Sequence, residues 1–282
     1  MFGQSSLKEN PSIGSQPTVT GDTLSERVIK TVLDENKDVS DAARLGRRKA
    51  MLRAVCAEFV GTVIYFVPIF GVLANNHTQG VGVFANRIST AAVSGMNVVC
   101  MIMCFSTLSG AIFNPAISFS LWITNKLSNR KCILFIITQM LASLMCMCII
   151  WAGFPTVNVE LWEALTLSPP SGASSWNVFF SEFICTFILT YAAFAMAFEE
   201  AESLKHSSMS VQAAQDSDGL VVFGSNPQSK VGFAPFALGF VVFSLSNFGG
   251  GSGPSMNPVR IFGPALLANK WDSFIFYMLG KK

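Results

Sequence analysis

Charged side chains are scarce in this sequence. Aspartate, glutamate, lysine and arginine make up 13% of its 282 residues, whereas soluble domains average about 25%. The net charge is only +2, and no run of basic residues interleaved with aromatics occurs, so nothing predicts a nucleic-acid partner. Hydrophobic residues account for 51% of the chain and gather in long runs, which indicates that a lipid bilayer surrounds most of it.

Histidine is also scarce, and cysteine lacks metal-ligand spacing. The two histidines, His77 and His206, lie in polar connections between apolar runs. The seven cysteines all lie inside apolar runs and none has C-x-x-C spacing, so they are predicted to be small core residues. Since no nucleophile–base pair or metal cluster is visible, the sequence predicts no enzyme, no metal site and no cofactor.

Apolar runs predict five membrane-spanning helices and the beginning of a sixth. The expected spans are 51–73, 88–108, 132–152, 176–198 and 231–248. The sixth run begins near Trp271, but the sequence stops at Lys282, and about ten residues at ~1.5 Å each are too few to cross a bilayer. The polar segment 1–45 lacks the apolar core of a secretory signal. It is predicted to be a mostly unstructured tail, with weak helical spacing from Leu24.

Basic residues orient the predicted bundle. One group precedes the first span and a second lies between the second and third spans, whereas segment 153–175 has no lysine or arginine. The positive-inside rule therefore predicts a cytoplasmic N-terminus. Asn76, in an Asn-x-Thr tripeptide, then faces the opposite side and is a candidate N-glycosylation acceptor, with an unused tripeptide as an equal alternative.

The chain contains an internal repeat. Glu58, in Ala-Glu-Phe-Val-Gly-Thr, and Glu182, in Ser-Glu-Phe-Ile-Cys-Thr, each open one half. Each half then carries an Asn-Pro dipeptide, in Asn114-Pro115-Ala116 and Asn257-Pro258-Val259. Because three spans separate the halves, the second is inverted in the membrane. The predicted channel domain, 46–282, thus has repeats of about 51–152 and 176–282.

The Asn-Pro dipeptides predict helix starts. Asparagine is a strong N-cap residue, and proline is favoured at the first helical position. Each dipeptide begins a stretch of about eleven residues, or roughly 16 Å, which is half the hydrocarbon thickness. Irregular backbone at that depth is tolerated only where it is buried or lines an aqueous path. Two such sites in an inverted repeat favour a pore over ordinary capped surface helices.

Residues 109–116 (Ser-Gly-Ala-Ile-Phe-Asn-Pro-Ala) and 256–265 (Met-Asn-Pro-Val-Arg-Ile-Phe-Gly-Pro-Ala) resemble the two signature loops of the aquaporin (major intrinsic protein) family. Ala57-Glu58-Phe59 and Gln139 also match its pattern. The resemblance implies an all-α membrane protein, a right-handed bundle of inverted repeats with two re-entrant half-helices. It further implies a homotetramer with one pore per subunit, in the plasma membrane or an intracellular vesicle or vacuole membrane.

The resemblance also assigns roles to the pore residues. Asn114 and Asn257 would donate amide hydrogens to a passing water, and Arg260 would form the selectivity filter. Counting from the two asparagines places Ser94, Leu245 and Pro254 at the other filter positions. This set departs from both the strict water pattern and the glycerol pattern. Water, a small neutral solute such as glycerol or urea, and a structural or adhesive protein without conductance all remain open.

Glu58 and Glu182 lie inside apolar runs, where a carboxylate needs hydrogen-bond donors. In the family such acids brace the irregular loops, and this role is favoured here over proton transfer.

A long polar insertion, 199–230, follows the fourth span on the predicted cytoplasmic side. It is predicted to be either a gate controlled by phosphorylation or a passive linker. The candidate gate residues are Ser207, Ser208, Ser210, Leu220, Val221, Val222 and Phe223.

Overall fold

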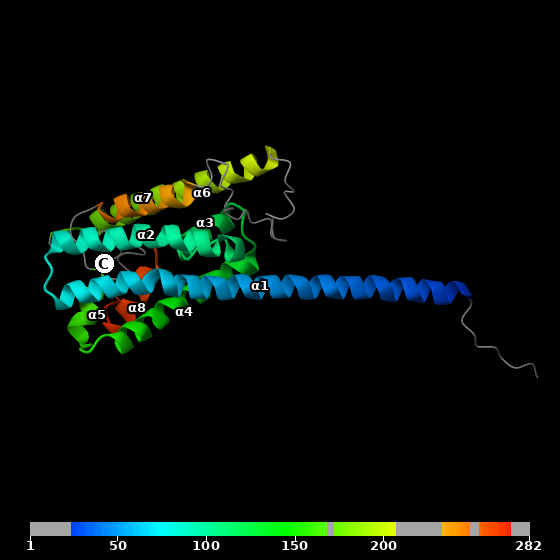
Figure 1. Cartoon of the computed structure of the whole chain (residues 1–282), viewed down its shortest axis with the longest axis horizontal. Coiled ribbons are helices and arrows are strands. Elements are labelled where there is room, and N and C mark those ends of the chain that lie inside the picture. The colour runs from blue at the N-terminus through cyan, green and yellow to red at the C-terminus, as the bar shows by residue number, and fades with distance from the viewer. Residues whose placement is uncertain (1–23, 168–171, 207–232, 249–253, 272–282) are drawn as a thin grey trace, which may run out of the picture. The chain divides into compact units, whose positions relative to one another are not determined.

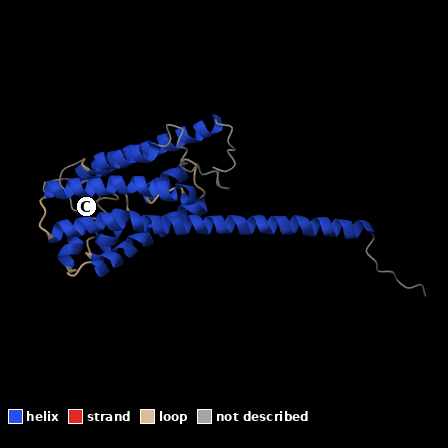
Figure 2. Ribbon diagram, in the orientation of Figure 1, coloured by secondary structure: helices blue, strands red, loops and turns tan. Residues whose placement is uncertain are grey.

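The computed structural model describes residues 24–167, 172–206, 233–248 and 254–271, which are helical and contain no strand (Figures 1 and 2). The helices are α1 (Leu24–Thr78), α2 (Val83–Ser109), α3 (Pro115–Ile123), α4 (Asn129–Gly153), α5 (Val159–Leu165), α6 (Ser175–His206), α7 (Ala234–Ser246) and α8 (Val259–Leu267). Helices α2 and α4, and parts of α1 and α6, are long and apolar enough to cross a bilayer. The expected all-α membrane architecture is therefore confirmed.

The chain forms two compact units, residues 1–46 and 47–282. In the first unit the structure describes only the beginning of α1, from Leu24. The prediction of an unstructured tail up to residue 45 is therefore wrong for this part. This segment contains no proline, and its only glycine is Gly46, so neither of the two residues least favourable to helix interrupts it before its end. Everything that follows concerns the second unit.

Two other predicted boundaries also differ from the structure. Helix α6 continues to His206, so the insertion predicted at 199–230 begins with helix and not with loop. Helix α7 has 13 residues, Ala234–Ser246, whereas the predicted span covered 231–248. Pro235 explains its start, because proline is tolerated only in the first turn of a helix. The predicted sixth span falls almost entirely on residues 272–282, outside the described residues.

The connection between α4 and α6 contains a short helix that was not predicted. Asn158 caps α5, and its Oδ1 accepts from the Leu161 backbone N–H at 2.9 Å. The helix buries Leu161, Trp162 and Leu165. Hydrophobic contacts and the cap together hold α5 against α8. This packing places the Leu165 carbonyl within reach of Arg260.

Close helix contacts hold the bundle together. Helices α2 and α7 run side by side (Figure 1). They approach closely at two glycines, since a Cβ built on Gly95 would lie 2.6 Å from the Gly239 carbonyl oxygen. Helix α4 packs against both short helices, α3 and α8. Ser143 on α4 donates to the Val259 carbonyl at 2.6 Å and accepts from the Gly263 N–H at 2.9 Å. This packing positions the start of α8 within the bundle.

Candidate pore

Helices α3 and α8 begin at the two predicted asparagines, in slightly different ways. Asn114 caps α3, with its Oδ1 accepting from the Ala116 N–H at 2.9 Å and Pro115 in the first position. Helix α8 begins at Val259 with Pro258 as its cap residue. The Asn257 Oδ1 nonetheless accepts from the Val259 N–H at 3.1 Å. Both side chains therefore satisfy a free N–H at a helix start.

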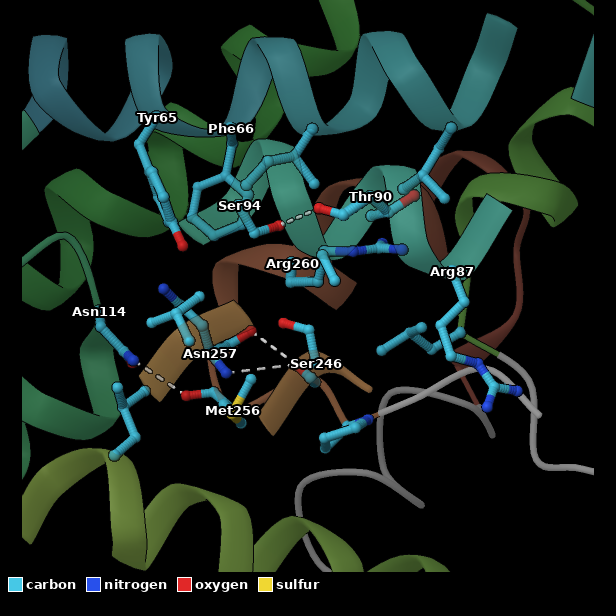
Figure 3. Close-up of a pocket in the computed structure, with 18 of the residues that line it drawn as sticks. Tyr65, Phe66, Arg87, Thr90, Ser94, Asn114, Ser246, Met256, Asn257 and Arg260 are labelled. Carbon is cyan, nitrogen blue, oxygen red and sulfur yellow. Dashed lines mark hydrogen bonds between the residues drawn. The ribbon is translucent and has the colours of Figure 1, made fainter. Parts of the chain in front are cut away.

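The two loops meet through reciprocal hydrogen bonds. The Asn114 Nδ2 donates to the Met256 carbonyl at 2.9 Å, and the Asn257 Nδ2 donates to the Phe113 carbonyl at 2.9 Å. The first of these bonds is drawn in Figure 3. Both asparagines are buried, at 3% and 8% exposure. The N-terminal ends of the two half-helices thus face one another inside the bundle.

Glu58 holds the first loop in place. Its carboxylate accepts from the Ile112 N–H at 3.0 Å, the Phe113 N–H at 2.8 Å and the Ser109 hydroxyl at 2.6 Å. A fourth donor, the Gln139 Nε2 on α4, lies at 2.7 Å. The side chain is fully buried, at 0% exposure. Four donors compensate a carboxylate that would otherwise be very costly in the interior.

Glu182 plays the matching part in the second loop. It accepts from the backbone N–H groups of Ser255 and Met256. Phe113 and Met256, each immediately before an asparagine, have φ values of 48° and 53°. Such left-handed backbone is unfavourable for these side chains. The carboxylate acceptors help to hold both loops in this conformation, which turns the Phe113 and Met256 carbonyls toward the opposing asparagine.

Two cavities lie on either side of the asparagine pair. The first has a volume of about 140 Å³ and the second about 90 Å³. Both are lined by Asn114 and Asn257, together with Tyr65, Leu189 and Val242. The pair therefore stands where two solvent-sized spaces approach each other in the middle of the bundle.

Arg260 lines the first cavity with a fixed orientation. Its Nη1 donates to the Leu165 carbonyl at 2.7 Å, and its guanidinium lies 5.3 Å from the centroid of the Phe70 ring. Ser94 and Pro254, which the sequence placed beside Arg260, line the same cavity. Figure 3 shows Ser94 and Arg260 reaching this space from different helices.

Leu245 does not join the other three predicted filter residues. It is 8% exposed and belongs to an apolar cluster with Met101 and Cys185, and among the described residues the wall of the first cavity holds Val242 and Ser246 instead. The prediction that Leu245 lines the filter is wrong by one position. The position was found by counting residues back from Asn257. That count crosses a glycine-rich segment, and the spacing across such a segment does not show which residue of the preceding helix faces the cavity.

The second cavity is mainly apolar, with irregular backbone on one side. Gly110, Ala111 and Ile112 of the first loop line it, and Lys126 is the only lysine or arginine among its described lining residues. Gly110 ends α2 with a φ of 95°, a conformation that glycine adopts at little cost. This turn is what lets the chain leave α2 and enter the interior as a loop.

Asn76 is not in an exposed loop. It lies in α1 with 7% exposure, and its Nδ2 donates to the Asn86 Oδ1 at 2.9 Å and to the Ser89 Oγ at 2.8 Å. The structure therefore contradicts the glycosylation prediction, because both amide hydrogens are used to join α1 to α2. The Asn-x-Thr pattern depends only on local sequence and contains no information about whether the asparagine is buried. The candidate gate residues, 207–210 and 220–223, lie outside the described residues.

Sequence reasoning missed several residues of the first cavity. Arg87 and Tyr65 line it, and the Leu165 carbonyl fixes Arg260. Arg87 carried a usable signal, since a cation at the start of an apolar run calls for an explanation. The Leu165 carbonyl carried none, because backbone contacts over 95 positions leave no mark in the local sequence. The described residues contain no group of acids, histidines and cysteines suited to a metal.

Two half-helices meeting end to end between two cavities define a channel-type membrane protein. A family model described as Major intrinsic protein matches residues 46–215 and 219–281. Aquaporin-B from Dictyostelium discoideum is 31% identical over 258 residues, which are 90% of this chain and 83% of that protein. Aquaporin PIP2-1 from Arabidopsis thaliana is 26% identical over 250 residues, 85% of this chain and 79% of that protein.

The fold also has a counterpart among solved structures. The aquaglyceroporin from Plasmodium falciparum superposes with a TM-score of 0.57 at 22% identity, covering 81% of this chain and 86% of that one. The chain belongs to the major intrinsic protein family, whose members are membrane channels. The expectation drawn from its two signature loops is thereby confirmed.

Proposed function

We propose that this protein is a passive channel for water that excludes protons and other ions. The meeting of the Asn114 and Asn257 amides between the two cavities carries the proposal. A carboxamide nitrogen has two hydrogens. One joins the opposing loop, and the other is available to the oxygen of a passing water.

The electrostatics of the path favour neutral solutes over cations. The N-terminus of each half-helix carries a partial positive charge, and the two face each other at the asparagine pair. A water held there by donors on both sides points its own hydrogens outward, which interrupts a continuous proton wire. Arg260 adds a full positive charge in the first cavity. The arrangement therefore opposes proton and cation passage with the chain's own dipoles.

The second candidate is a facilitator for glycerol, urea or another small neutral solute. Phe66, Ile69 and Val242 line the same cavity as Arg260 and Ser94, so its lining combines apolar and polar side chains. This is the surface that a polyol with a hydrocarbon backbone requires. A structural or adhesive role without conductance is the third candidate.

Stopped-flow light scattering on proteoliposomes separates the three candidates. An osmotic step with an impermeant solute measures water flux, and an isosmotic glycerol or urea gradient measures solute flux. We expect water flux several-fold above protein-free liposomes, with an activation energy near that of bulk water diffusion. Fast solute entry would favour the second candidate. Protein-free rates for every solute would contradict any channel.

The same proposal includes an arrangement in the membrane. The protein is a homotetramer with a cytoplasmic N-terminus, in the plasma membrane or a vesicle or vacuole membrane, and segment 199–230 gates the pore under control of phosphorylation. Deleting residues 207–219 should then change the water flux of correctly inserted protein. Unchanged flux would assign the segment to a linker. Cross-linking and native mass measurement test the tetramer.

A further inference from the structure

A small set of residues forms the boundary between the two cavities. Among the described residues, those that line both cavities are Tyr65, Asn114, Leu189, Val242 and Asn257. The asparagines enter the proposed function through their amides. Leu189 on α6 and Val242 on α7 are aliphatic, so Tyr65 on α1 is the aromatic member of this set. The proposed function gives Tyr65 no part.

Tyr65 turns its polar end toward the asparagine pair. Figure 3 shows its side chain reaching from α1 toward Asn114 and Asn257, and no hydrogen bond joins its hydroxyl to the other residues drawn. The residue is half-buried and borders both cavities. Because a phenol hydroxyl both donates and accepts hydrogen bonds, it is available to a molecule that crosses from one cavity to the other.

The backbone that carries Tyr65 is fastened to α2. Pro68 lies inside α1, and because proline has no backbone N–H, it cannot donate to the Ile64 carbonyl one turn earlier. Asn97 on α2 supplies the missing donor, since its Nδ2 lies 3.1 Å from the Ile64 carbonyl oxygen and 2.7 Å from that of Tyr65. The Phe66 ring packs edge-on against the Tyr65 ring, with 4.7 Å between centroids. These contacts hold the Tyr65 ring at the boundary.

The width of this boundary limits what crosses. The cavities have volumes of about 140 Å³ and about 90 Å³, and each has room for several waters. The larger side chains beside the asparagine pair are those of Tyr65, Leu189 and Val242, of which the tyrosine is the longest. Replacing its ring by a shorter side chain therefore widens the passage between the cavities.

We infer that Tyr65 is a specificity-determining residue of this passage. Its ring limits the width to a single water, and its hydroxyl gives that water a hydrogen-bond partner. Asn97 is a positioning residue, because it holds the α1 backbone that carries the ring. The inference rests on the proposed function, since it concerns what passes between the same two cavities.

The ratio of glycerol to water permeability in proteoliposomes tests the ring. Tyr65→Leu shortens the side chain and should raise this ratio about tenfold, the lower end of what a small change of volume gives in a tight apolar site. Tyr65→Phe keeps the ring and should keep the ratio. Its water flux should fall about fivefold, the factor that corresponds to one ordinary hydrogen bond. Unchanged water flux in Tyr65→Phe would overturn the role of the hydroxyl.

Tyr191→Leu is the matched control, because it makes the same substitution away from the passage. Tyr191 lies on α6, is 68% exposed and lines neither cavity. This variant should keep the wild-type ratio. An equal rise in both leucine variants would overturn the inference, since the cause would then be a general loosening of the bundle.

Asn97→Leu tests the positioning role. It removes both hydrogen bonds to α1 and should raise the ratio by less than Tyr65→Leu does, because the ring is still present. Asn247→Leu is its control, since the Asn247 amide bonds the Phe243 carbonyl of its own helix, and it should leave the ratio unchanged. If Asn97→Leu lowered only the yield of inserted protein and kept the ratio, Asn97 would not position the ring.

The failure of this inference differs from the failure of the proposed function. A wild type that passes water, with a ratio that Tyr65→Leu leaves unchanged, would overturn the inference and leave the water channel standing. Rapid glycerol entry through the wild type would overturn it and favour the second candidate. A wild type that passes neither solute, beside a Tyr65→Leu variant that passes water or glycerol, would contradict the proposed function and support the ring as the limit. Protein-free rates in both forms would contradict both.

Discussion

Glu58 accepts four hydrogen bonds, of which three come from the end of α2 and the loop that follows it, and the fourth from Gln139 on α4. These three donors are the Ile112 and Phe113 backbone N–H groups and the Ser109 hydroxyl, and all three residues are buried. The side chain therefore contributes to the pore indirectly, by holding the Phe113 carbonyl where Asn257 can reach it.

Glu58→Gln should lower the free energy of unfolding by about 3 kcal/mol, because an amide brings its own N–H₂ against these donors. Thermal unfolding of the detergent-solubilised protein measures the change. Glu163→Gln makes the same substitution in an exposed pair, where the Glu163 Oε2 lies 3.0 Å from the Lys270 Nζ. Glu163→Gln should lower the free energy of unfolding by less than about 1 kcal/mol. Equal shifts in the two variants would contradict the bracing role of Glu58.

Ser246 and Leu245 are neighbours on α7, but only Ser246 lines the first cavity. Cysteine substitution distinguishes them. Since no native cysteine is among the described residues lining either cavity, water flux through the unmodified protein should resist a charged thiol reagent. Ser246→Cys should lose more than half of its flux on treatment, and Leu245→Cys should lose little. If the reagent inhibited only Leu245→Cys, Leu245 and not Ser246 would line the cavity, as the count from the sequence predicted.

At the scale of helices, two glycines set the distance between α2 and α7. A Cβ on Gly95 would lie 2.6 Å from the Gly239 carbonyl oxygen, and one on Gly239 would lie 2.4 Å from the Val99 Cγ2. Because both contacts involve another helix, an added methyl group forces the helices apart. Val242 and Ser246, which line the first cavity, lie on α7, so the crossing also sets the width of the path.

Gly95→Ala should therefore destabilise the protein by about 1–3 kcal/mol through overpacking. Gly71→Ala is the control, since a Cβ there meets nothing within 4 Å. In that variant the better helix propensity of alanine should leave stability unchanged or raise it by up to about 1 kcal/mol. Denaturant titration in mixed micelles provides both values. If Gly95→Ala left the free energy of unfolding unchanged, the contact between α2 and α7 would have room for an added methyl group.

The sequence was sufficient for features that depend on local chemistry. An asparagine followed by a proline predicts a helix start because capping involves only the next few residues, and both half-helices begin within two positions of Asn114 and Asn257. The same local view failed at Asn76 and Leu245, whose surroundings come from other helices. Pairings such as Asn114 with Met256 required the fold.

At the scale of the whole molecule, the two repeats complete one another. Each loop supplies a carbonyl, and the other loop supplies the amide that satisfies it, across 142 and 144 positions. Asn114→Asp should break this exchange, because a carboxylate cannot donate to the Met256 carbonyl, and it places a negative charge where the half-helices meet. We expect lower water flux and a new proton leak, measured with a pH dye inside proteoliposomes.

Asn247→Asp is the control for that variant. The Asn247 Nδ2 donates to the Phe243 carbonyl of its own helix at 2.8 Å, so the substitution loses a hydrogen bond away from the junction. It should leave the liposomes tight to protons. If both variants leaked protons to a similar extent, the leak would come from replacing an asparagine in general, and not from the place where the two half-helices meet.

The shared carbonyls also constrain how the protein is made. A ribosome delivers the first half of the chain before Asn257 exists, and during that interval the Phe113 carbonyl needs another partner, because bare hydrocarbon offers it none. We therefore expect that turn to stay hydrated until the second half of the chain is inserted. Two half-chains made together in one cell should rescue each other, whereas either half made alone should be recognised as damaged and degraded.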